Sequence, residues 1–132
     1  MDRVRKLDAE NIIVVTNNIK ITVEAVEENR AAVRAFIQDM QGPIVLVIDY
    51  REAETSFNDI LEMIQRNQAG SRADLNERVF SIFVGTDKFL HMYRESMGLP
   101  QFGGNQVPCF SDIDVALAAA RLYIERESRS KD

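Results

Sequence analysis

Apolar runs of this chain end in polar side chains at Asp49, at Thr86 with Asp87, and at Asp112. If these runs are parallel strands, their carboxyl ends meet at one edge of a sheet, where α/β proteins usually bind ligands. Asp49 could there bind a cation or a ligand hydroxyl group. The same residues could equally satisfy loop amides and cap the helices that follow. The sequence leaves both interpretations open.

A second candidate site is a predicted helix start at Ser56-Phe57-Asn58-Asp59, which has the pattern of a capping box. A phosphate on Ser56 or on the neighbouring Thr55 would meet the free amides of the helix N-terminus. Ser56 could instead be only an N-cap, which contributes about 1 kcal/mol. The pattern alone is compatible with a phosphoacceptor and with a cap.

Other reactive residues do not assemble into a motif. His91 is the single histidine and cannot by itself supply a multi-ligand zinc site. A Cys109–His91 nucleophilic pair lacks an orienting third group, and Cys109 on a predicted strand is typical of a small buried apolar residue. Gly103-Gly104 precedes a strand rather than a helix, so it does not fit a phosphate-binding loop. We therefore predict a protein that is not an enzyme and has no cofactor or metal.

Composition narrows the class of protein further. The chain has 132 residues, a formal net charge of −5 and one cysteine. This length suits one domain spanning residues 1–132, and we expect a charged tail over about 125–132 to fray. The acidic body disfavours nucleic acid, and the lone cysteine fits a reducing cytoplasm. The chain shows no signal-peptide pattern and no apolar run near the ~20 residues of a membrane span, so we expect no membrane insertion.

The apolar pattern predicts an α/β fold. Continuous apolar strands are expected at 12–16, 44–49, 79–84 and 107–110, each followed by a helical pattern. A weaker strand is expected over 4–8. Four strand-helix units at this spacing are typical of a mainly parallel sheet, here with an extra strand at its N-terminal edge.

The chain resembles the STAS, or anti-sigma-factor-antagonist-like, fold. The residues that carry the resemblance are Leu46-Val47-Ile48-Asp49, Phe83-Val84-Gly85-Thr86 and Val107-Pro108-Cys109-Phe110-Ser111-Asp112. The resemblance spans nearly the whole chain, is architectural, and points to a bacterial branch outside the signalling members. It implies four strand-helix turns after an extra N-terminal strand.

Signalling STAS proteins carry an Asp-Ser-Ser-Gly quartet at the start of the second helix, and a partner kinase phosphorylates its serine. An ungapped register from Asp49 puts Asn58 at the phosphorylated position. A two-residue gap puts Ser56 there instead. Neither register retains the glycine or the whole quartet.

We predict a non-enzymatic STAS-like module that binds a protein partner or forms a homodimer. Its working surface would be the loop over 50–55 and the next helix start, including Tyr50, Glu54, Ser56 and Phe57. The alternative is a carrier of a small or apolar ligand, with a pocket at Asp49, Tyr50, Thr86 and Asp87. A flavodoxin-like receiver would need an acidic cluster after its first strand and a lysine after its last strand, and this chain has neither.

Overall fold

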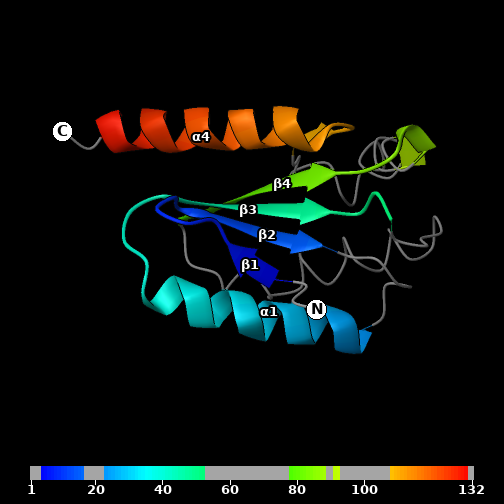
Figure 1. Cartoon of the computed structure of the whole chain (residues 1–132), viewed down its shortest axis with the longest axis horizontal. Helices are drawn as coiled ribbons and strands as arrows, with labels where there is room; N and C mark the ends of the chain where they lie inside the picture. Colours follow the sequence, from blue (N-terminus) through cyan, green and yellow to red (C-terminus); the bar gives the residue numbers. More distant parts are fainter. Residues whose placement is uncertain (1–3, 17–22, 53–77, 89–90, 93–107, 131–132) are drawn as a thin grey trace, which may run out of the picture.

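A computed structural model of the chain describes residues 4–16, 23–52, 78–88, 91–92 and 108–130. Its centre is a five-stranded sheet in the order β1-β2-β3-β4-β5. β1 is antiparallel to β2, and the other neighbouring strands are parallel to one another (Figure 1). The strands are β1 (Val4–Lys6), β2 (Ile12–Thr16), β3 (Ile44–Asp49), β4 (Val79–Val84) and β5 (Cys109–Phe110).

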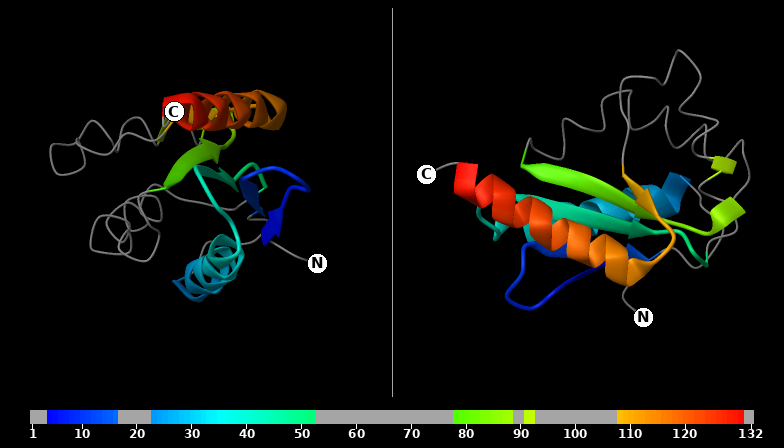
Figure 2. Two further views of the ribbon diagram at one scale, coloured as in Figure 1. Left: turned by 90° about the vertical axis from the view of Figure 1, so that its left-hand side faces the viewer. Right: turned by 90° about the horizontal axis from the view of Figure 1, so that it is seen from above.

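Helices cover both faces of this sheet. α1 (Val23–Gln38) lies against one face and α4 (Ile113–Ser130) against the other (Figures 1 and 2). Residues 87–88 and 91–92, which follow β4, are also helical. Because both faces of the central strands are covered, β2 and β3 need apolar side chains at nearly every position, as their sequences have.

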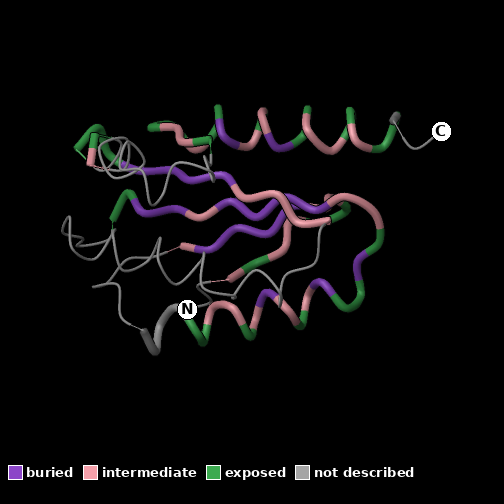
Figure 3. The backbone as a smooth tube through the Cα atoms, turned by 180° about the vertical axis from the view of Figure 1, so that it is seen from behind, coloured by how far each residue is buried: buried purple, intermediate pink, exposed green. Residues whose placement is uncertain are grey.

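Side chains of the central strands alternate between the two helices. Ile13 and Leu46 pack on the α1 side, with Val33 and Ile37. The alternate positions in the strands, such as Val14 and Val47, pack on the α4 side. Figure 3 shows the resulting buried stretch through the middle of the sheet. Full burial of one such side chain stabilises the fold by about 1.5 to 3 kcal/mol.

α4 approaches the sheet through small residues. Ala116 and Ala120 lie one helical turn apart and are completely buried. Partly buried neighbours complete the contact, and among them the Tyr123 ring stacks on Phe80 with centroids 4.3 Å apart. The apolar face of α4 is therefore fixed on the sheet, which leaves its opposite face outward.

The turn between α1 and β3 is held by side chains from distant parts of the chain. Gly42 has a φ of 80°, a backbone conformation that glycine adopts without strain. The Asn11 side-chain amide donates to the carbonyl oxygens of Gln41 and Pro43. The Arg78 Nη1 donates to those of Met40 and Gly42, at 3.0 and 3.1 Å. These bonds give partners to the four consecutive carbonyl groups of residues 40–43, in the turn between α1 and β3.

The structure confirms the predicted α/β class and the extra strand at the N-terminal edge of the sheet, and it shows that this strand is antiparallel to β2. The bounds of β2, β3 and β4 agree with the predicted strands. α4 continues to Ser130, into the charged segment expected over about 125–132, and an Arg129–Glu125 ion pair lies in its last turn. Within the described helices, no stretch has the length and apolar character that crossing a membrane requires.

Candidate functional site

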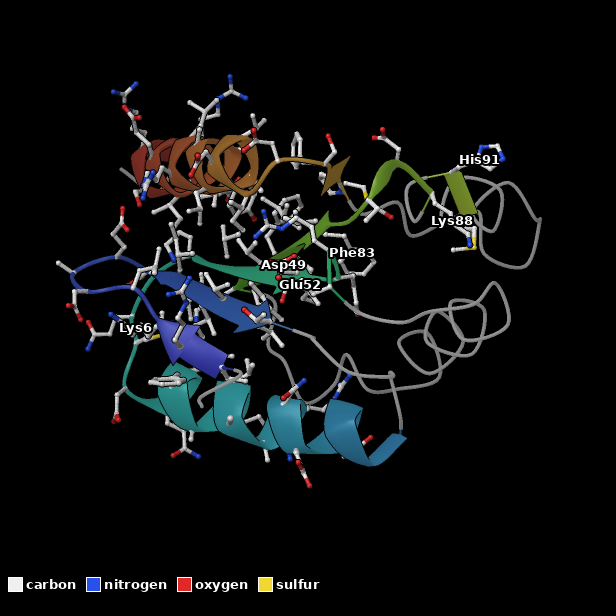
Figure 4. All side chains as sticks on the ribbon, turned by 45° about the vertical axis from the view of Figure 1, so that its right-hand side comes forward. Lys6, Asp49, Glu52, Phe83, Lys88 and His91 are labelled. Atoms are coloured by element: carbon white, nitrogen blue, oxygen red, sulfur yellow. The ribbon has the colours of Figure 1, made fainter. Side chains whose placement is uncertain are left out.

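The parallel strands end together in one row across the sheet. Thr16 of β2 pairs with Asp49 of β3, Asp49 pairs with Val84 of β4, and Val84 pairs with Phe110 of β5. Asp49 is the acidic residue in the middle of this row. Figure 4 shows it at the heads of the strands, with Glu52 and Phe83 beside it.

Asp49 is buried, with 6% of its surface exposed, yet it carries a carboxylate. Its Oδ1 accepts hydrogen bonds from the backbone N–H and the Nε of Arg51, both at 3.0 Å. Its Oδ2 accepts from Arg51 Nη2 at 2.9 Å and from Nε at 3.2 Å. This is a two-pronged ion pair between residues two positions apart, closed by a backbone contact that shapes the turn after β3.

Arg51 connects the buried carboxylate to the surface. Its side chain is 41% exposed, against 9% for that of Asp49. The hydrogen bonds that Arg51 donates to Asp49 raise the pKa of Arg51, and the carboxylates of Glu52 and Asp112 raise it further. The guanidinium therefore stays charged, and it is held in one orientation at an exposed strand end.

Tyr50 lies between these two residues in sequence but points into the fold. Its backbone N–H donates to the Val84 carbonyl oxygen at 2.7 Å. Its ring is 6% exposed and meets the Phe83 ring edge-on, with centroids 5.6 Å apart. Tyr50 thus anchors the end of β3 to β4 and leaves the outer surface to its neighbours.

Exposed polar residues follow the carboxyl ends of β3, β4 and β5. We call this the carboxyl-edge surface, and it consists of Arg51, Glu52, Thr86, Asp87, Lys88 and Asp112. Glu52 follows β3, and Thr86 to Lys88 follow β4 through Gly85, whose N–H donates to the Phe110 carbonyl oxygen at 2.9 Å. Lys88 and His91 lie farther out on the helical residues in Figure 4.

Asp112 completes this surface at the start of α4. Its Oδ1 accepts from the backbone N–H of Asp114 at 2.7 Å and from that of Val115 at 3.4 Å. Asp112 is therefore the N-cap of α4, which is one of the two roles that the sequence left open for it. This cap satisfies the first amides of α4, so they do not form an open anion site.

The carboxyl-edge surface has an acidic balance. Asp49 neutralises Arg51 through their ion pair, so Lys88 is the positive charge that remains. Glu52, Asp87 and Asp112 contribute three carboxylates. A basic group would be attracted to such a surface at low ionic strength.

The residues considered for metal binding and for nucleophilic chemistry lie in the described part of the chain. No cluster of three His, Cys, Asp or Glu side chains there has the geometry to hold a metal ion. His91 is exposed, as expected for a surface histidine. Cys109 is partly exposed, which differs from the buried position expected of it.

The structure brings four of the predicted site residues to one edge of the sheet. Asp49 ends β3 and Tyr50 follows it, while Thr86 and Asp87 follow β4. The predicted residues Glu54, Thr55, Ser56 and Phe57 lie outside the described residues. Arg51 was missed, although an aspartate at a strand end followed two residues later by an arginine is a detectable signal for this turn.

Comparison of the chain with models of known families, with curated proteins and with solved structures finds no match.

Proposed function

We propose that this chain is a non-enzymatic STAS-like module that docks a protein partner on its carboxyl-edge surface. The observation that carries the proposal is the buried Asp49 carboxylate, which is fully engaged in holding the exposed Arg51 guanidinium. A charged group is costly to bury, and here its effect is to orient one surface side chain at the edge where α/β folds bind their ligands.

The same contacts speak against a catalytic role for Asp49. A general base must accept a proton from a bound substrate within hydrogen-bonding reach. Both Asp49 oxygens instead accept hydrogen bonds from Arg51, and the residue is almost completely buried. Asp49 therefore fits a positioning role better than a role in acid–base chemistry.

The charges indicate what the partner presents. Glu52, Asp87 and Asp112 favour a partner segment that is rich in lysine or arginine. Arg51 Nη1 takes no part in the hydrogen bonds to Asp49, which leaves its N–H groups as donors for a carbonyl or carboxylate oxygen of the partner. A basic segment with one oxygen placed over Arg51 would match this surface.

The test compares two charge-reversed variants as baits for cross-linked partners identified by mass spectrometry. The first variant carries Glu52→Lys and Asp87→Lys on the carboxyl-edge surface. The control carries Asp8→Lys and Asp39→Lys, which make the same charge change at exposed positions at the opposite, amino-terminal edge of the sheet. We expect the first variant to lose the partner that the wild type and the control recover.

The partner should also dissociate as salt rises from about 0.05 to 0.5 M, since screening shortens the reach of exposed charges. If both variants recover the same proteins, or if the wild type recovers none, docking at this surface is wrong. The packing of Asp49 and Tyr50 into the fold favours docking of a partner over the carrying of a small or apolar ligand.

A further inference from the structure

Among the residues that the structure describes, the large apolar side chains left exposed are Val115 and Leu122, at 49% and 47%. Both belong to α4 and lie seven residues apart, which is two helical turns or about 10.5 Å. Ala118, between them, is also exposed. These three residues form a continuous apolar stripe on the side of α4 opposite the buried Ala116 and Ala120.

The outer face of α1 differs. Its exposed positions include Glu27, Glu28 and Gln38, and the exposed residues between them are alanines. A polar outer face is the usual state of a helix that faces only water. The α4 stripe is therefore a specific feature of that helix. In Figures 1 and 2, α4 forms one outer side of the molecule, so the stripe is accessible along its length.

Opposite charges flank the stripe on one side. Asp114 and Arg121 are seven residues apart and stand beside Val115 and Leu122 respectively. Arg121 donates from Nε to Glu10 Oε1 at 2.7 Å, but its side chain remains 53% exposed. The acidic and the basic residue thus occupy the two ends of the same flank of the stripe.

We propose that the outer face of α4 packs antiparallel against the same face of a second copy of this chain. A two-fold axis between Ala118 and Ala119 places Val115 of each copy against Leu122 of the other. The same axis brings each Asp114 within about one helical turn of the other copy's Arg121. Small residues at the axis allow the two helix backbones to approach closely.

Self-complementarity favours a second copy over an unrelated partner. In the antiparallel arrangement the apolar pair and the charged pair are each satisfied twice, and the two helix dipoles oppose each other. In a parallel arrangement the two-fold axis runs along the helices and puts this flank of the two copies on opposite sides of the contact, so Asp114 and Arg121 would meet neither partner there. The spacing of seven residues in both pairs is what allows the antiparallel match.

The contact is small, so the dimer is weak. One helix face buries less than the roughly 1,200 Å² of a standard specific interface. The net charge of −5 on each copy also opposes association. We expect a dissociation constant on the order of 10 to 100 μM. The inference does not rest on the proposed function, because the stripe lies outside the carboxyl-edge surface.

A charge-swap experiment tests the arrangement by sedimentation velocity at about 0.5 mM protein, several times the expected dissociation constant. Asp114→Arg alone places two arginines together across the axis, and Arg121→Asp alone places two aspartates together. Each variant should weaken the homodimer at least about tenfold. An equimolar mixture restores two attractive pairs per dimer and should associate at least as well as the wild type.

Glu28→Arg is the matched control, because it makes the same charge change as Asp114→Arg on the exposed face of α1. It should dimerise like the wild type. Far-ultraviolet circular dichroism confirms that every variant is folded. A monomeric wild type at this concentration would overturn the proposal, and so would a mixture that associates no better than the two variants alone.

Discussion

The ion pair between Asp49 and Arg51 predicts an unequal response to removing either partner. Arg51→Met keeps most of the aliphatic stem but removes the guanidinium, so the buried Asp49 carboxylate is left with the backbone N–H of residue 51. Asp49→Asn keeps an oxygen for that N–H and leaves Arg51, which is 41% exposed, free to be solvated. Arg51→Met therefore leaves a buried charge without its ion-pair partner, and Asp49→Asn does not.

The magnitude follows from the burial of the two side chains. Breaking a fully buried pair costs about 3 to 5 kcal/mol, and breaking an exposed pair costs about 0 to 1 kcal/mol. With Asp49 buried and Arg51 partly exposed, we expect Arg51→Met to lower the free energy of unfolding by about 2 to 3 kcal/mol. Asp49→Asn should cost about 1 kcal/mol, the scale of a lost hydrogen bond.

Urea unfolding measures these costs as shifts of the midpoint at constant slope. Arg129→Met is the control, because it breaks an arginine–carboxylate pair whose side chains are 77% and 53% exposed. It should cost less than about 0.5 kcal/mol. The double variant Asp49→Asn with Arg51→Met should cost less than the sum of the single changes. Two results together would refute the idea that a buried charge holds this turn. Arg51→Met and Arg129→Met would lower the free energy of unfolding equally, and the effects of Asp49→Asn and Arg51→Met would be strictly additive.

Two further predictions concern the pH response and the backbone. Burial raises the pKa of Tyr123 above 10.0, and the negative charge of Glu127 raises it further. The neutral phenol therefore stabilises the fold below about pH 10. This stabilisation is lost as the pH rises through the raised pKa of Tyr123. Tyr123→Phe should make the urea midpoint less sensitive to pH in that alkaline range, and an unchanged pH profile would contradict the prediction. Gly42→Ala should cost about 1 kcal/mol through its φ of 80° alone, because an added Cβ would meet only Asn11 Nδ2 at an ordinary 3.8 Å. Ala9, with a φ of 60°, provides the reverse control. Ala9→Gly should leave the free energy of unfolding unchanged or raise it in the same urea assay. Equal losses of unfolding free energy for Gly42→Ala and Ala9→Gly would rule out the φ argument.

The sheet could be predicted because its strands obey a strong local rule. A strand covered on both faces needs apolar residues in sequence, and β2 and β3 have them from Ile12 and Ile44 onward. Parallel pairing then gathers the carboxyl ends of the strands, so the proximity of Asp49 to Thr86 and Asp87 follows from topology. This part of the candidate site is dictated by patterns within single segments of the chain.

The details of the site depend on contacts that such patterns do not contain. Tyr50 was expected on an exposed loop, but its N–H extends the bonding to Val84 and draws the ring inward against Phe83. The Arg51 side chain could fold back onto the sheet or extend into water. It folds back, because its Nε donates to the buried Asp49 carboxylate two residues earlier. In the charged C-terminal segment, an i,i+4 ion pair and good helix formers continue α4 to Ser130.

The register of the sheet links the two proposed surfaces. Asp49 has the same strand parity as Val45 and Val47, which pack beneath α4, so its side chain lies on the α4 side of the sheet. Arg51 is consequently close enough to Asp112, the cap of α4, for the carboxylate to influence its pKa. The docking surface therefore adjoins the first turn of the helix that we propose as the dimer contact. The axis between Ala118 and Ala119 overlaps residues 113–124 of the two helices, so the two first turns lie at opposite ends of this overlap, about 12 Å apart along the helices. Such a dimer could bind two basic segments at once, and a weak self-contact would then increase the avidity for a partner that carries both.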